Sequence, residues 1–159
     1  IFTVSWIGTI CSDPAMCYIS VRPSRHSYDI IKRNGEFVIN LTNEDLAYAT
    51  DWCGVKSGRD FNKFKEMKLT PMKTSVINSV LIEESPLSIE CKVKQIIPLG
   101  SHDMFIAEVV NVLADEKYID KETDAFNLSD AKLMAYNHGN YYKIGEKIGK
   151  FGWSVQKKK

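Results

Sequence analysis

The residues best suited to binding a ligand lie near the start of the chain, between Thr3 and Ile31, where hydroxyl-bearing and small side chains alternate with apolar ones. A buried strand does not need so many hydroxyls, and a tryptophan, Trp6, lies among them. The segment 22–27 (RPSRHS) then gathers two arginines, a histidine and two serines just before a short helical pattern. Free backbone N–H groups at a helix start can face an anion. This combination predicts a cradle for an anionic cofactor.

A second candidate is the basic loop 54–60 (GVKSGRD), which leads into another short helical pattern. A serine hydroxyl, loop amides and cations are the groups that a phosphate monoester needs. Gly58 would let the backbone approach such a ligand closely.

Plainer interpretations fit the same residues. Serine, threonine and glycine are common in edge strands and turns, and Ser24 or Ser27 can simply cap a helix. Trp6 can be a core residue, and the basic loop can be a solvated connector.

The elements that must position these residues are mostly strands. The hydropathy pattern predicts strands at 3–7 (broken at Gly8-Thr9), 10–11, 16–21, 36–41, 87–97 and 102–113. It predicts short helices at 28–32, 42–53, 61–67 and within 128–136, with Gly54 following the second. The clearest element is the hairpin 87–113, with a bulge expected at Ile96-Ile97. Residues 69–86 are expected to form a long surface excursion.

Composition limits the class of protein. A chain of 159 residues fits one domain with one core, so 1–159 is expected to be a single domain, with a strand possible before Ile1. With 21 basic and 20 acidic residues, the net charge of +1 disfavours a nucleic-acid partner. Neither a signal peptide nor an apolar run of ~20 residues is present, which predicts a cytoplasmic protein without a membrane partner.

The residue types of catalysis and metal binding are scattered. The chain has four cysteines: Cys11, Cys17, Cys53 and Cys91. Their spacing, and that of the three histidines, predicts neither a zinc site nor a redox dithiol, so we expect free, mostly buried thiols. No nucleophile–base or carboxylate pair can be argued from spacing, so no catalytic residue is predicted. Neither a P-loop nor a G-x-G-x-x-G motif occurs.

Several blocks, in order, resemble the flavin reductase-like family, the FMN-binding split barrels that include flavoredoxin-type proteins. The blocks read SW-x-GT-x-CSDP, S-x-RP-x-R-x-SY-x-IIK, SGRD-x-x-KF and H-G-x-Y-Y-x-x-G-x-x-x-G-x-FG-x-S. The likeness runs from Thr3 to about Val155. It implies an antiparallel split β-barrel with short helices, which forms a homodimer and holds FMN near the subunit interface.

The resemblance also implies which residues bind the cofactor. Those expected along the flavin ring and ribityl chain are Ser5, Trp6, Thr9, Ile10, Cys11 and Ser12, with Trp6 against the ring. Those expected toward the phosphate are Ser27, Ser57, Arg59 and Lys63.

The family implies an oxidoreductase that passes electrons from NAD(P)H to flavin or another small acceptor. The flavin itself carries that chemistry, which suits a chain without a catalytic constellation. One alternative is a flavoredoxin-type electron carrier reduced by a protein partner. Another is a β-barrel that binds a different small ligand, or serves as an interaction module, without being an enzyme. NAD(P)H, if used, would stack on the flavin.

Overall fold

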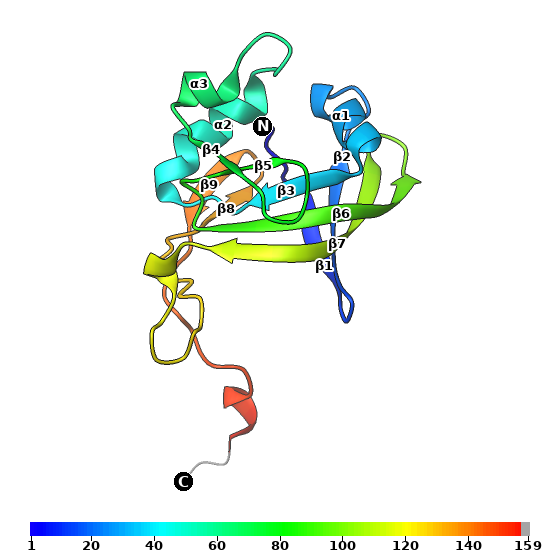
Figure 1. Ribbon diagram of the computed structural model, residues 1–159. Helices are drawn as coiled ribbons and strands as arrows, with labels where there is room; N and C mark the ends of the chain where they lie inside the picture. The colour runs from blue at the N-terminus through cyan, green and yellow to red at the C-terminus, as the bar shows by residue number, and fades with distance from the viewer. Residues whose placement is uncertain (157–159) are drawn as a thin grey trace.

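The computed structural model describes residues 1–156 and contains a curved five-stranded sheet with short helices gathered at one end (Figure 1). The strand order is β1-β2-β7-β6-β3, and every pairing is antiparallel. The strands are β1 (Ile7–Ser12), β2 (Ala15–Val21), β3 (Glu36–Asn40), β6 (Leu87–Pro98) and β7 (Asp103–Ala114). The predicted mainly β, antiparallel architecture and the long hairpin are therefore confirmed.

Three helices lie at the same end of the sheet: α1 (His26–Asn34), α2 (Ala47–Val55) and α3 (Lys63–Met67). Gly35, at φ +69°, ends α1 by donating its N–H to the Ile31 carbonyl, in the left-handed conformation that glycine tolerates. The side chain of Asn62 accepts from the N–H of Lys65 and caps α3. Within residues 1–156, no helix is long and apolar enough to cross a membrane.

Two small hairpins flank the main sheet. Strands β4 (Pro71–Lys73) and β5 (Val80–Ile82) form one, and β8 (Met134–Asn137) and β9 (Asn140–Lys143) form the other. Short 3₁₀ turns complete the fold at Glu44–Leu46, Glu116–Tyr118 and Trp153–Val155.

The core lies between the inner face of the sheet and α1. Alternate residues of β2 point inward, as the period of two requires, and pack on Phe105 and Ala107 of β7, both fully buried. From α1, Tyr28 and Ile31 reach the same cluster because residues three apart share a helix face. Each large apolar side chain buried here stabilises the fold by about 1.5–3 kcal/mol.

Two cysteines meet inside this core, although they are far apart in the sequence. The sulfur atoms of Cys17 and Cys91 lie 3.6 Å apart, and contact with Cys17, together with burial, raises the pKa of the Cys91 thiol. Their strands, β2 and β6, are separated by β7. Two strand spacings amount to roughly 9.6 Å, whereas a disulfide spans less than about 7 Å between Cα atoms. This spacing does not suit a disulfide; all four cysteines are free and three are buried, as expected.

A buried carboxylate ties the segment between β4 and β5 to the sheet. Glu90 of β6 is fully buried and accepts from the backbone N–H groups of Ser75, Val76 and Ile77 at 2.8–3.0 Å. The side chain of Asn111 also donates to it, at 3.0 Å. Burial raises the pKa of Glu90, but these hydrogen bonds outweigh it and the pKa lies below its usual 4.5. The predicted surface excursion at 69–86 is therefore wrong in part: most of these residues are exposed, but Thr74, Ile77 and Leu81 are buried.

The first strand begins later than predicted. It starts at Ile7 rather than Thr3 and runs through Gly8-Thr9, with its irregularity between Thr9 and Cys11. Within residues 1–6, the hydroxyl of Thr3 instead donates to the Thr50 carbonyl of α2, while Phe2 and Val4 pack against the core.

Other local predictions also differ from the structure. In β6 the register shifts fall between Glu90 and Cys91 and between Val93 and Gln95, not at Ile96-Ile97. Gly54 lies inside α2 instead of after it. The helix expected within 128–136 is a turn followed by β8, because the Asn127 side chain accepts from the N–H groups of Ser129 and Asp130 and closes that turn.

Candidate functional site

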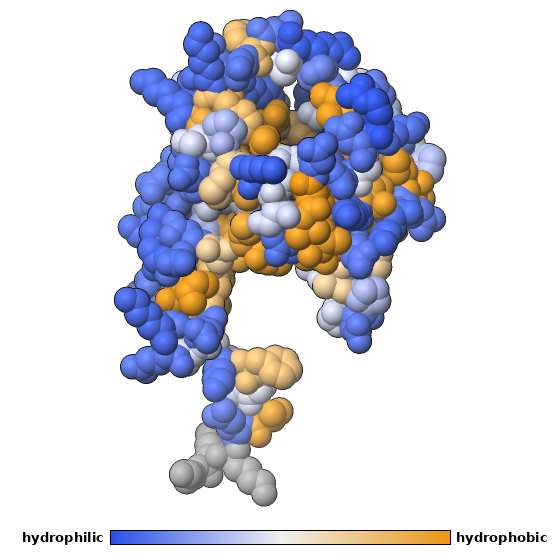
Figure 2. All heavy atoms as spheres, viewed as in Figure 1, coloured by the Kyte–Doolittle hydropathy of each residue, from blue (hydrophilic) through white to orange (hydrophobic). Residues whose placement is uncertain are grey.

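A cavity of about 560 Å³ lies at the helical end of the sheet. Its walls are the β2–α1 turn (residues 22–25) with the start of α1, the α2–α3 loop (residues 56–62), and the N-terminal segment 1–6. These elements converge at the top of Figure 1, and Figure 2 shows the surface hollowed between α1 and the α2–α3 side. The volume is typical of sites that bind small molecules or cofactors.

The N-terminal segment forms one side of the cavity because it packs closely on α2. A Cβ atom at Gly54 would lie 3.3 Å from the Cβ of Thr3, so a glycine in the helix permits this approach. Beyond Thr3, the carbonyl of Trp6 accepts from the N–H of Ser20 at 2.9 Å and joins the segment to the end of β2. Ser5 and Trp6 are thereby held on the lining.

The β2–α1 turn presents two arginines to the cavity. The N–H of Arg25 donates to the Arg22 carbonyl at 3.0 Å, which closes a turn with Pro23 at its second position. Arg25 is the N-cap of α1, and its side chain makes no capping bond, so its guanidinium is free for another partner. Ser27 lies in the first turn of the helix and is not the cap.

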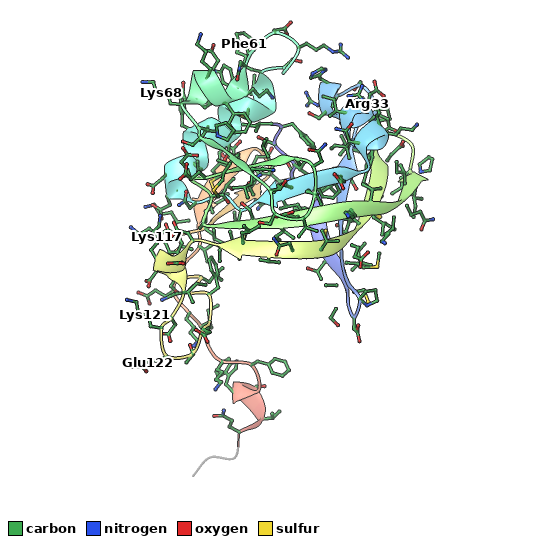
Figure 3. All side chains as sticks on the ribbon, in the orientation of Figure 1. Arg33, Phe61, Lys68, Lys117, Lys121 and Glu122 are labelled. Atoms are coloured by element: carbon green, nitrogen blue, oxygen red, sulfur yellow. The ribbon has the colours of Figure 1, made fainter. Side chains whose placement is uncertain are left out.

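The α2–α3 loop is held close to α1 and is internally bonded. A Cβ atom at Gly58 would lie 3.2 Å from a ring carbon of His26, so glycine allows the loop to reach the helix start. Within the loop, the hydroxyl of Ser57 accepts from the N–H of Arg59 at 3.2 Å. Phe61, labelled in Figure 3, packs edge-on against Trp52 of α2. The loop therefore holds Ser57 and Arg59 at fixed positions beside α1.

Lys63 lines the cavity but already has an internal partner. Its side chain is 6% exposed, and its ammonium donates to the Cys53 carbonyl near the end of α2 at 2.6 Å. Burial lowers the pKa of Lys63, the Cys53 thiol partly opposes this, and the charge of Arg25 lowers it further. A cation at a helix C-terminus is favourable. Lys63 thus links α3 to α2 and supports the loop between them.

The lining of the cavity contains basic residues but no acidic ones. Although 20 of the 159 residues of the chain are acidic, none of them is among the residues that line this cavity. The basic residues of the lining are Arg22, Arg25, Lys56, Arg59 and Lys63. Across residues 1–156, the ion pairs that form involve other side chains, and no hydrogen bond engages a guanidinium of this set. We call this site the basic cavity; unpaired cations without neighbouring acids favour an anionic ligand.

Trp6 stands at the edge of the basic cavity and is not a core residue. Its side chain is 56% exposed, and its ring lies 4.2 Å from that of His102 at a tilt of 34°. A ring nitrogen of His102 is in turn 2.9 Å from the hydroxyl of Ser101. An exposed aromatic face held in this way is available to a planar ligand.

The structure brings six of the ten predicted cofactor residues together. Those lining the basic cavity are Ser5, Trp6, Ser27, Ser57, Arg59 and Lys63. The other four, Thr9, Ile10, Cys11 and Ser12, lie on β1, which runs from this end of the sheet toward the β1–β2 turn at the opposite end (Figure 1). The binding roles of all ten remain predictions.

The sequence assigned no binding role to Arg22, Arg25, Lys56 or His102, all of which line the cavity. The signal for the two arginines was present in the RPSRHS segment, whereas His102 comes from a distant hairpin turn. Within the described part of the chain, no group of three His, Cys, Asp or Glu side chains could hold a metal ion.

Comparison with known families gives one match that covers most of the chain. The model described as "Flavin reductase like domain" matches residues 1–145. Among curated proteins, an FMN reductase (NADH), RutF, from Pseudomonas syringae pv. syringae is 22% identical over 70% of this chain and 60% of its own length. The chain spans 40% to 70% of the length of the three curated relatives that it matches first.

Solved structures share the fold. Flavoredoxin of Desulfovibrio vulgaris (Miyazaki F) matches with a TM-score of 0.90 and 26% identity, over 98% of this chain and 84% of that chain. An FMN-binding protein from Thermus thermophilus matches with a TM-score of 0.78 and 20% identity, over 92% and 79%. A split-barrel flavin reductase from Shewanella frigidimarina matches with a TM-score of 0.83 at 22% identity, over 94% and 76%. The expected split-barrel class is confirmed.

Proposed function

The chain belongs to the flavin reductase-like domain family, and we propose that it is an FMN-binding oxidoreductase that passes electrons from NAD(P)H to flavin or another small acceptor. The observation that carries this proposal is the basic cavity, where unpaired arginines and serine hydroxyls face a site without acids, beside the exposed face of Trp6. Bound FMN would supply the redox chemistry, while the chain binds, orients and tunes it.

The residues present fit FMN by their chemistry. A phosphate monoester calls for charge-assisted donors, and Arg25 and Arg59 provide them beside Ser27 and Ser57. The close approach that Gly58 permits brings the loop amides to the helix start, as an anion site requires. Lys63 contributes positive charge and, through its bond to the Cys53 carbonyl, keeps the loop in place.

The ring-side assignments belong to the same proposal. Trp6 would lie against the ring, with Ser5 nearby, and Thr9, Ile10, Cys11 and Ser12 of β1 would contact the ring and ribityl chain. For Trp6→Ala we expect a shifted flavin spectrum or reduction rate with near-normal FMN affinity, because the phosphate anchor is untouched. Absorbance spectra of the FMN-loaded variant and parent, recorded with the dissociation constant of each, measure this.

We also propose that two copies associate and that the flavin lies near their interface. The segment after β9 leaves the body of the molecule (Figure 1), and Figure 2 shows apolar side chains along it. Ile148 is 92% exposed and Phe151 is fully exposed, and the edge strand β1 exposes Ile7 and Ile10. Light scattering of the purified protein gives the oligomeric state; a monomer at all concentrations would contradict this part.

A flavoredoxin-type electron carrier is a second candidate, favoured by the high structural similarity to a flavoredoxin. Anaerobic mixing of the FMN-loaded protein with NADH and NADPH separates the two. Bleaching of the flavin absorbance by either nucleotide supports the oxidoreductase, whereas reduction only by a protein donor supports the carrier. If purified or FMN-reconstituted protein has no flavin spectrum, the third possibility, a small-ligand-binding barrel without flavin, takes precedence.

A further inference from the structure

The basic cavity carries more positive charge than FMN can balance. Its lining includes three arginines and two lysines and no acid. A phosphate monoester carries about −1.5 to −2 at pH 7. With FMN in place, the lining would therefore keep a surplus of roughly three positive charges by the same charge count. Such a surplus in a cleft attracts a further anion.

The cations are also not all at one end of the cavity. The approach of Gly58 to His26 and the influence of Arg25 on Lys63 place Arg25, Lys63 and the loop of Arg59 together. Arg22 begins the β2–α1 turn: it follows Val21, whose partner across the sheet is Asp103, so its backbone stands opposite His102. His102 stacks on Trp6. The turn that Arg22 closes with Arg25 therefore extends from the predicted phosphate cluster toward Trp6.

We propose that the FMN-loaded cavity binds a dinucleotide electron donor that carries a phosphate monoester in addition to its pyrophosphate, and so prefers NADPH to NADH. This inference rests on the proposed function. The pyrophosphate of NADH offers two negative charges, fewer than the surplus, whereas the 2′-phosphate of NADPH adds nearly two more. Arg22 and Lys56, which have no acidic partner within residues 1–156, are the side chains that we assign to the added phosphates.

A nucleotide suits these cations better than an acidic protein because they line a concave cavity and not a broad face. Protein partners usually need a broad face that buries about 1,200 Å² or more in total. The preference is expected to weaken with salt, since exposed charges are screened beyond about 8–10 Å at physiological ionic strength.

The test uses FMN-loaded protein and two fragments that cannot reduce flavin, 2′,5′-ADP and 5′-AMP, which differ by the 2′-phosphate. Calorimetric titration is expected to give a dissociation constant about tenfold or more lower for 2′,5′-ADP, as one charge-assisted phosphate contact predicts. Arg22→Gln and Lys56→Gln should each remove most of that difference. Arg33→Gln is the matched control, because Arg33 is exposed on α1 outside the lining (Figure 3).

The outcomes separate this inference from the function on which it rests. If the parent protein binds no FMN, the proposed function fails. If it binds FMN but 2′,5′-ADP and 5′-AMP bind equally, or neither binds, the donor assignment is overturned while the flavin assignment stands. Equal loss of discrimination in Arg33→Gln would show a general charge effect and would also overturn the assignment of Arg22 and Lys56. FMN affinity, measured for each variant, confirms that the site is folded.

Discussion

Glu90 and the arginines of the basic cavity are charged groups in opposite situations. The carboxylate of Glu90 is fully buried and receives four hydrogen bonds from its own chain. The guanidinium groups of Arg22, Arg25 and Arg59 border a cavity, and no hydrogen bond or ion pair within residues 1–156 engages them. The first charge is balanced by the fold, and the second set has no partner within the described residues.

This difference indicates how to separate structural from binding charges. A charge whose partners lie within the chain should affect stability when removed, and a charge without them should affect ligand affinity. Lys63 combines the two, because it lines the cavity and also bonds to the Cys53 carbonyl. The resemblance to the family grouped Lys63 with Arg59, but the structure gives them different environments.

The largest effect is expected for Glu90→Ala. Three backbone N–H groups would lose their acceptor, at about 1–3 kcal/mol each when buried, so we expect a loss of roughly 3–5 kcal/mol after partial rehydration. Urea unfolding measures it. Glu36→Ala is the control, because Glu36 accepts from one exposed N–H of the same segment, that of Asn78. A loss below about 1 kcal/mol for Glu90→Ala would contradict the structural role.

Lys63→Met should reduce both the stability of the fold and the affinity for FMN. Losing a charged hydrogen bond costs about 1.5–3 kcal/mol of stability, and the freed loop should also weaken FMN binding. Urea unfolding and FMN titration of the same samples measure the two changes. Lys65→Met on α3, where the side chain is exposed, is the control and should change neither. Weaker FMN binding with unchanged stability would make Lys63 a simple phosphate ligand.

Arg59→Ala should weaken FMN binding without changing the stability of the fold. A direct contact with phosphate predicts a rise in the FMN dissociation constant of about ten- to a hundredfold, with the free energy of unfolding within about 0.5 kcal/mol of the parent. Quenching of FMN fluorescence measures the affinity, and Arg33→Ala serves as control. A change below about twofold, as expected of a solvated charge, would place the phosphate elsewhere.

Lowering the pH should reduce the contribution of Glu90 to stability by a smaller amount than Glu90→Ala does. Because its pKa is lower in the folded protein than in the unfolded chain, its contribution to stability is present above pH 4.5 and is lost as the pH falls through the folded pKa. Glu90→Gln removes this titration. We therefore expect the stability gap between parent and Glu90→Gln to narrow steadily below pH 4.5, measured by urea unfolding at several pH values. A gap independent of pH would mean that the carboxyl is not ionised in the folded protein.

Features encoded in neighbouring residues were the predictable ones. The hairpin 87–113 followed from the alternation of apolar residues, and the two short basic segments that each end at a helix start line one cavity. Contacts between distant segments were missed. Nothing near Glu90 in the sequence indicates that it binds the amides of residues 75–77, and nothing near Thr3 indicates that it contacts Gly54. Yet these contacts position the segment between β4 and β5 and the N-terminal segment.

The register shifts of β6 were misplaced for a related reason. The apolar pair Ile96-Ile97 suggested a bulge there, but the partner strand β7 sets the register, and the shifts fall beside Glu90 and Val93. One of them lets Glu90 and Cys91, which are neighbours, both be buried. Sequence periodicity predicts which strands exist better than how they pair.

The most direct test of the account compares the binding of FMN and of riboflavin, which lacks the phosphate, to apoprotein of the parent and of Arg59→Ala. If the unpaired cations of the basic cavity recognise the phosphate, FMN should bind the parent about tenfold or more tightly than riboflavin, and that ratio should shrink in Arg59→Ala. Riboflavin affinity should be nearly the same in both proteins. Equal binding of FMN and riboflavin by the parent would contradict the central claim that this cavity is the anion-binding site of a flavoprotein.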